Sequence, residues 1–225
     1  MARKLLAAAL VLMLALGGAL WLGGREAATG MTALAPLAAL AEETAPAAAA
    51  KEVPELVLGN ADAPITVIEY ASYTCPHCAH FHADVFKDLK TNYIDTGKVK
   101  FVFREVYFDR YGLWASVVAR CGGPTRYFGI SSMLFDGQKE WAGSDDPTVV
   151  VENLKKIGRT AGMDDPTLAA CLEDKAMMEA MVAKFQANTT ADKVEGTPTL
   201  IINGEKHSNM SYADLAKILD EKLGG

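Results

Sequence analysis

Four residues in the first half of the chain, Cys75-Pro76-His77-Cys78, have the types and spacing of a redox-active pair. Two cysteines separated by two residues can close to a disulfide and reopen to two thiols. They follow the apolar run 65–70, which predicts a buried strand, and they precede a helical pattern that begins at Pro76. A helix N-terminus offers unpaired N–H groups and a positive dipole end, which lower the pKa of a cysteine placed there. The pattern predicts thiol–disulfide exchange.

The order of the two cysteines predicts different roles for them. We expect Cys75, just ahead of the helix, to be the exposed nucleophile, and the more buried Cys78 to resolve the mixed disulfide. Pro76 is tolerated in the first turn, where its missing N–H would have no partner. His77 can donate a hydrogen bond or a charge to the thiolate, and each pKa unit of such stabilisation corresponds to about 30 mV of potential. The alternative is a solvent-exposed His77 without effect.

Glu69 places a carboxylate in the predicted strand 65–70, where burial is costly. One interpretation turns its side chain out to the sheet edge. The other makes it a buried acid with a raised pKa that passes a proton to or from Cys78. Arg104 and Glu105, on a neighbouring predicted strand, could pair with Glu69, but we expect a solvated surface pair.

The N-terminal segment is typical of export. Two basic residues precede the uncharged apolar run 5–22, so residues 1–24 are predicted to be a signal peptide or, if uncleaved, a membrane anchor. Residues 25–54 are rich in Ala, Thr, Pro and Glu, a composition that predicts a flexible linker. Either alternative places the following domain outside the cytoplasm.

Export changes the interpretation of the remaining cysteines, Cys121 and Cys171. In an oxidising compartment, four cysteines indicate disulfides rather than zinc. Because Cys75 and Cys78 pair locally, the other two are predicted to form a structural bridge worth about 4 kcal/mol in loop closure. The alternative is two buried free thiols. The formal net charge of −6 gives no support for nucleic-acid binding.

The predicted elements run β-α-β, then a helical block, then β-β-α. The predicted strands lie over 55–58, 65–70, 98–106, 197–203 and 205–207. The predicted helices lie over 76–93, in a block over about 109–190, and from 212 to about 223. A helical crossover between the two main strands implies parallel pairing, and Asn203-Gly204 predicts a hairpin turn. We therefore predict an α/β fold, with a mixed sheet flanked by helices and an inserted all-helical domain.

Together these features resemble the thioredoxin superfamily, and more closely the DsbA-type thiol:disulfide oxidoreductases of the bacterial envelope. The resemblance rests on the Cys-Pro-His-Cys motif, on a glutamate six residues before its first cysteine, and on Gly196-Thr197-Pro198-Thr199 before a late strand. It covers residues 55–225 and implies a thioredoxin fold with a helical insertion. A second bridge in the helical block resembles that of some alphaproteobacterial members.

The resemblance carries further expectations. It implies that the Thr197-Pro198 bond is cis and lies beside the cysteines, with backbone groups of Thr197 free to pair with a substrate strand; the alternative is trans proline in a simple turn. It favours Glu69 as a buried acid. It also implies a periplasmic enzyme, soluble or tethered to the inner membrane, that gives its disulfide to reduced exported proteins. A quinone-linked membrane partner would restore the oxidised form. Beyond the cysteine pair we expect no cofactor, no nucleic-acid partner and a monomer.

Two other functions stay open at this stage. A disulfide isomerase or reductase of the same fold would be kept reduced by a different membrane partner, although residues 25–54 are too short for a dimerisation domain. A copper or zinc chaperone could use the local Cys/His cluster: Cys75, His77, Cys78, His80 and His82. On the predicted helix residues 78 and 82 share a face and 80 points away, so we expect no metal site.

Overall fold

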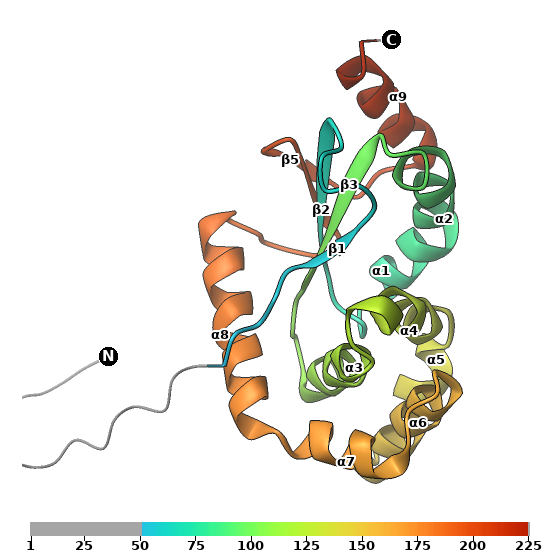
Figure 1. Ribbon diagram of the computed structural model, residues 1–225, viewed down its shortest axis with the longest axis vertical. Helices are drawn as coiled ribbons and strands as arrows, with labels where there is room; N and C mark the ends of the chain where they lie inside the picture. Colours follow the sequence, from blue (N-terminus) through green and yellow to red (C-terminus); the bar gives the residue numbers. More distant parts are fainter. Residues whose placement is uncertain (1–50, 225) are drawn as a thin grey trace, which may run out of the picture. The chain divides into compact units, whose positions relative to one another are not determined.

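A mixed sheet forms the centre of the computed structural model, which describes residues 51–224 (Figure 1). Its strands are β1 (Leu56–Leu58), β2 (Ile65–Ala71), β3 (Val99–Glu105), β4 (Thr199–Ile202) and β5 (Glu205–Ser208). Their order is β1-β3-β2-β4-β5; β2 and β3 are parallel, and every other pair is antiparallel. The predicted edge strand, the parallel central pair and the final hairpin are confirmed. Asn203 and Gly204 turn that hairpin with φ of 48° and 87°, the positive values a tight turn needs.

The segment between β2 and β3 is helical but not continuous. It consists of α1 (Pro76–Phe81), a π-helical segment η1 (His82–Phe86), α2 (Lys87–Leu89) and a second π-helical segment η2 (Lys90–Ile94). The prediction of an uninterrupted α-helix over 76–93 is therefore wrong, because two π-helical segments interrupt it. A π-helical turn holds more than 3.6 residues, so the side chains after Phe81 are rotated relative to a regular helix.

Six helices occupy the chain between β3 and β4. They are α3 (Arg110–Cys121), α4 (Pro124–Asp136), α5 (Gln138–Ala142), α6 (Pro147–Thr160), α7 (Asp165–Glu173) and α8 (Lys175–Ala191); α9 (Tyr212–Lys222) ends the chain. Side-chain oxygens cap several of them: Asp109 accepts from Gly112 N–H, Asp164 from Thr167 N–H and Ser211 from Asp214 N–H. Gly123-Pro124 and Gly137 lie where one helix ends and the next begins.

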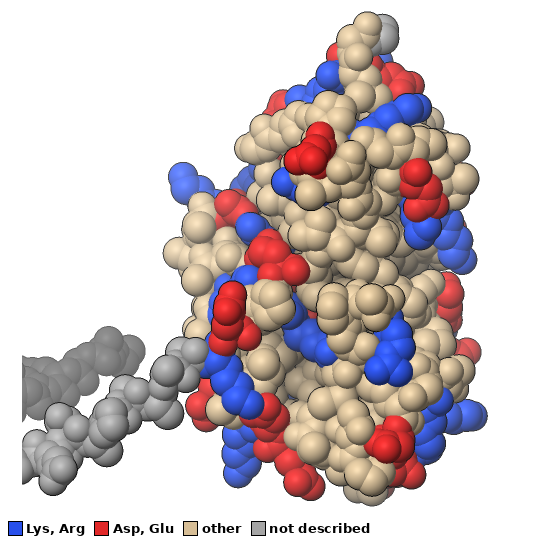
Figure 2. Space-filling view, viewed as in Figure 1, with Lys and Arg blue, Asp and Glu red and all other residues tan. Residues whose placement is uncertain are grey.

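Helices cover both sides of the sheet. In Figure 1, α8 runs along one side of the strands, α1, α2 and α9 lie on the other, and α3–α7 gather beyond one end. The period-two alternation of β2 explains this layering, because Val67 faces the core under α1 and α9 while Tyr70 packs in a smaller core with Phe185 of α8. On the face shown in Figure 2, acidic and basic side chains are interspersed.

The first described residues belong to the folded part of the chain. Val53 is buried against Val117 and Met181, and its carbonyl accepts a hydrogen bond from Lys184. Lys51 forms an ion pair with Asp174. Val53 and Lys51, which the sequence assigned to the linker, therefore contact the folded part of the chain. The predicted signal or anchor, residues 1–24, and linker residues 25–50 lie outside the described residues. None of the helices within 51–224 is long and apolar enough to cross a membrane.

Candidate active site

Cys75 and Cys78 lie at the start of α1, directly after the carboxyl end of the central strand β2. Cys75 is the N-cap residue, and its carbonyl accepts hydrogen bonds of 3.1 Å from the N–H groups of Cys78 and Ala79. Both cysteines carry free thiols. Cys75 is 8% exposed and Cys78 is fully buried. Cys75 is thus the more accessible of the two, as expected, but it is far less exposed than the sequence suggested.

The environment lowers the pKa of Cys75 to about 5. A hydrogen bond from the Cys78 thiol contributes most, and it outweighs the desolvation that opposes ionisation. Thr197 and the backbone N–H groups of Cys78 and His77 add to the effect. His77 therefore contributes through its backbone, whereas its side chain is exposed to solvent beside Pro76, which is exposed too. Cys75 is a thiolate at neutral pH.

The same environment acts in the opposite direction on Cys78. Burial raises the pKa of its thiol well above the ordinary value, and the hydrogen bond to Cys75 and the negative charge of Glu69 raise it further. Cys78 therefore stays protonated while Cys75 is ionised. A thiol that is to act as a nucleophile from this position needs a nearby group to accept its proton.

Glu69 is buried in the middle of the sheet, so its side chain does not turn out to the sheet edge, and its part in proton transfer stays a prediction. The residue is 0% exposed, its Oε2 lies 2.9 Å from Nε2 of His82, and its Oε1 has no hydrogen-bond partner. The ring of His82 stacks on Phe135 with centroids 3.9 Å apart. From the sequence, His82 was a candidate only for the Cys/His metal cluster. Its place four residues after Cys78 was the available signal that it faces the same core.

Thr197 and Pro198 lie against the cysteine pair. Their peptide bond is cis, and the carbonyl of Thr197 accepts a weak hydrogen bond from the Cys75 thiol at 3.6 Å. This hydrogen bond exists only while Cys75 keeps its proton, and the pairing of Thr197 backbone groups with a substrate strand stays a prediction. A groove of about 510 Å³ runs beside them between α1 and β5. Its lining includes His77, Thr197, Pro198, Lys206 and Ser208.

Comparison with known proteins agrees with this geometry. The family model described as thioredoxin matches residues 51–221. The chain belongs to the thioredoxin family. Alpha-DsbA1 of Wolbachia pipientis superimposes with a TM-score of 0.71 and 28% identity, over 77% of this chain and 93% of that one. The predicted thioredoxin fold with inserted helices and the resemblance to DsbA-type proteins are confirmed.

Relatives found by sequence carry related names. A Rickettsia bellii protein named "Putative protein-disulfide oxidoreductase" is 35% identical over 170 residues, which cover 75% of this chain and 64% of that protein. Disulfide bond formation protein D of Bacillus subtilis is 29% identical over 178 residues, 75% of this chain and 77% of that protein. The chain thus spans less than two thirds of the Rickettsia relative.

Two charged residues of this thioredoxin-family protein differ from expectation. Arg104 and Glu105 do not form a surface pair: Arg104 binds Glu55 and Asp192, while Glu105 is 7% exposed and binds Arg120 through two guanidinium nitrogens. The alternation of β3 is the reason, because neighbouring residues point to opposite faces of the sheet. Neither residue pairs with Glu69.

Gln138, at the start of α5, was missed by the sequence analysis. Its buried amide donates to the carbonyls of Tyr73 (2.7 Å) and Cys75 (3.0 Å). The helical block therefore contacts the backbone of the cysteine turn directly. A glutamine after Asp136-Gly137 carries no sequence signal for this role, because the turn that it reaches lies more than sixty residues away.

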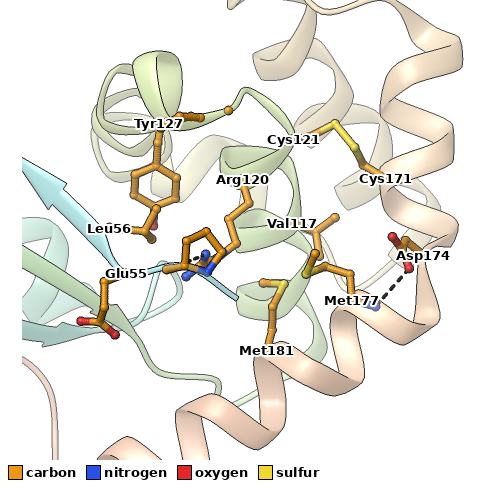
Figure 3. Close-up of a pocket in the computed structure, with 13 residues that line it drawn as sticks. Glu55, Leu56, Val117, Arg120, Cys121, Tyr127, Cys171, Asp174, Met177 and Met181 are labelled. Atoms are coloured by element: carbon orange, nitrogen blue, oxygen red, sulfur yellow. Dashed lines mark hydrogen bonds between the residues drawn. A yellow bond between two sulfur atoms is a disulfide. The ribbon is translucent and has the colours of Figure 1, made fainter. Parts of the chain in front are cut away.

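The second pair of cysteines forms a disulfide. It joins Cys121, the last residue of α3, to Cys171 of α7. As Figure 3 shows, the bridge forms part of the wall of a pocket between α3 and α8. That pocket has a volume of about 340 Å³ and a mainly apolar lining, including Leu56, Val117, Tyr127, Met177 and Met181. Met181, which is also part of the small core with Val53 and Val117, and Met177, which packs against that core, both line this pocket.

The histidines near the cysteine pair do not converge. His77 and His80 are exposed, whereas His82 is buried against Glu69. Among residues 51–224, no three His, Cys, Asp or Glu side chains lie where they could jointly hold a metal ion.

Proposed function

We propose that the chain is a thiol:disulfide oxidoreductase that transfers a Cys75–Cys78 disulfide to reduced proteins. The observation that carries the proposal is the asymmetry of the pair: the pKa of Cys75 is lowered to about 5, while that of its buried neighbour Cys78 is raised. In such a pair the Cys75 sulfur is a good leaving group, and Cys78 remains a buried, protonated thiol. The names of the relatives support the same activity.

The exchange proceeds in two steps. A substrate thiolate attacks the sulfur of Cys75 in the oxidised pair, and the bond to Cys78 breaks, leaving a mixed disulfide and a Cys78 sulfur that takes up a proton. A second substrate thiolate then attacks the substrate sulfur of the mixed disulfide, and Cys75 leaves as a thiolate. Low leaving-group pKa speeds this second step. The substrate leaves with one disulfide, and the enzyme is left as the dithiol.

The direction of the reaction follows from the stability of the Cys75 thiolate. Hydrogen bonds to Cys75 that exist only in the reduced protein make reduction favourable, so the disulfide is an oxidant. The groove beside Thr197 and Pro198 provides the surface on which an unfolded substrate strand would lie. The exported location rests on the apolar run 5–22. Reoxidation by a quinone-linked membrane partner, which we include in the proposal, follows from the resemblance to DsbA-type proteins.

The reduction potential tests the proposal. Purified protein is equilibrated with glutathione buffers, and the reduced fraction of the Cys75–Cys78 pair is measured by alkylation and mass spectrometry. We expect a value near that of DsbA, about −120 mV. A value near −270 mV, typical of thioredoxin, would instead indicate a reductase. Cys75→Ala serves as the control, since it removes the exchange while leaving Cys121–Cys171 intact.

A further inference from the structure

Two buried groups, Cys78 and Glu69, lie close enough for the charge of one to act on the other, and His82 contacts Glu69. Cys78 and Glu69 are both 0% exposed, and the charge of Glu69 acts on the Cys78 thiol. Oε2 of Glu69 lies 2.9 Å from Nε2 of His82, whose side chain keeps 7% exposure against none for Glu69. The Oε1 atom of Glu69 is free of hydrogen bonds. Glu69 thus has one oxygen held by the imidazole and one available to a proton.

The walls around the pair are aromatic. Phe86, from the same helical segment, Phe103 of β3 and Phe135 of α4 all have ring centroids within 6.0 Å of the His82 ring. In such a site an uncompensated charge is costly, and a carboxyl–imidazole pair that shares one proton is neutral overall. A second proton taken up by Glu69 would give the pair a net positive charge, so its release is favoured.

The other charged groups on the elements around His82 form ion pairs of their own or lie at the surface. Glu105, on the same face of β3, binds Arg120. Lys87 and Asp136, on α2 and α4, pair with each other at the surface, where both side chains are more than half exposed. Asp84, within the π-helical segment, is exposed. The titratable group of β2 that contacts His82 is Glu69.

We propose that His82 is the outer member of a proton relay, Cys78–Glu69–His82, and sets the pH dependence of the resolving step. The inference rests on the proposed thiol–disulfide exchange. When Cys78 attacks the mixed disulfide at Cys75, its S–H proton passes to Glu69 as the new S–S bond forms and the partner leaves as a thiolate. His82 carries the proton on to water. In disulfide donation the same groups return a proton to the departing Cys78 sulfur.

Resolution kinetics test the relay. The mixed disulfide between Cys75 and a small thiol is formed, and its decay is followed by rapid mixing from pH 4.5 to 9. His82→Gln keeps a donor to Glu69 but cannot titrate; the matched control is His80→Gln, an exposed histidine of the same helix. We expect His82→Gln to slow the decay about tenfold or more and to remove an inflection between about pH 5 and 8. His80→Gln should match the wild type.

Proton NMR of the imidazole provides a measurement that does not depend on turnover. The titration midpoint of His82 should differ between oxidised and reduced protein, and Glu69→Gln should abolish that difference. Equal decay rates and equal pH profiles for His82→Gln and wild type, with a redox-independent His82 titration, would overturn the relay. A reductive potential in the wild type, together with a redox-dependent His82 titration, would overturn the proposed function while supporting the relay.

Discussion

Asymmetry between two chemically identical side chains is the central property at the residue scale. Cys75 and Cys78 are two residues apart, yet the pKa of the first is lowered and that of the second is raised. The opposite directions share a cause, because the Cys78 thiol donates a hydrogen bond that stabilises the Cys75 thiolate and holds its own proton more tightly. Sequence alone indicated the low pKa through the helix N-terminus, but it could not show that Cys78 is the main donor.

Removing that donor should therefore raise the pKa of Cys75. In Cys78→Ala the thiolate loses its largest stabilising hydrogen bond, and we expect the pKa of Cys75 to move from about 5 towards the ordinary thiol value. Thiolate absorbance at 240 nm, followed as a function of pH, measures the change. In Cys78→Ser a hydroxyl can still donate, so the shift should be smaller. Equal titrations of Cys78→Ala and the wild type would contradict the assignment.

The lowered pKa of Cys75 also predicts how the stability of the reduced protein depends on pH. The unfolded chain binds a proton at this thiol up to about pH 8.5, whereas the folded chain releases it at about pH 5. Stability from the thiolate is thus fully present above the unfolded pKa and is lost as pH falls through about 5. Guanidinium unfolding of reduced protein, compared with Cys75→Ala, should show an advantage that shrinks between pH 9 and pH 5. A difference in unfolding free energy that does not change with pH would contradict the assignment of Cys75 as a thiolate in the folded protein.

At the element scale, the helices of the insertion support the cysteine turn. Gln138 of α5 satisfies the carbonyls of Tyr73 and Cys75 on either side of Thr74. A buried carbonyl without a donor is costly, and that of Tyr73 has no strand neighbour because β2 ends at Ala71, whereas that of Cys75 also accepts from the N–H groups of Cys78 and Ala79. The insertion thus does more than cover the sheet, since it fixes the backbone from which α1 begins.

Gln138→Ala should loosen this turn. We expect a loss of about 1–3 kcal/mol in unfolding free energy, since the buried carbonyl of Tyr73 loses its donor and that of Cys75 loses one of its three. The change should also broaden the amide signals of residues 73–79 in NMR spectra. Gln186→Ala, at an exposed position of α8, is the matched control and should change stability by less than about 0.5 kcal/mol. Similar losses of unfolding free energy in both variants would mean that the Gln138 amide does not stabilise the cysteine turn.

The elements themselves were largely predictable because their signals are local. The alternation in 98–106, the prolines that begin helices and the Asn203-Gly204 turn each depend on a few neighbouring residues. The π-helical turns after Phe81 have no such signal, and they were missed. Burial of Glu105 and Gln138 depends on partners elsewhere along the chain, so composition and spacing could not reveal it.

At the scale of the whole molecule, one buried ion pair joins the sheet to the helical block. Glu105 ends β3, and Arg120 lies near the end of α3. Arg120 donates to both carboxylate oxygens over 2.7–3.0 Å, and Tyr107 and Tyr127 donate to the same carboxylate. The hydroxyl of Tyr127 is also hydrogen-bonded to the hydroxyl of Tyr73, 2.8 Å away, and Tyr73 lies two residues before Cys75. The pair therefore connects the sheet, the insertion and the active-site turn.

Arg120→Met should reveal how much this connection stabilises the fold. The substitution leaves Glu105 buried without its cation, and breaking a buried pair from one side costs about 3–5 kcal/mol. Adding Glu105→Gln should recover part of that loss, because the uncompensated charge is then gone. The control is Lys87→Met, whose partner Asp136 lies 3.5 Å away at the surface; such a pair contributes about 0–1 kcal/mol. Guanidinium unfolding at pH 7 measures all three. Equal losses for Arg120→Met and Lys87→Met would show that the two parts of the molecule are held together by apolar packing instead.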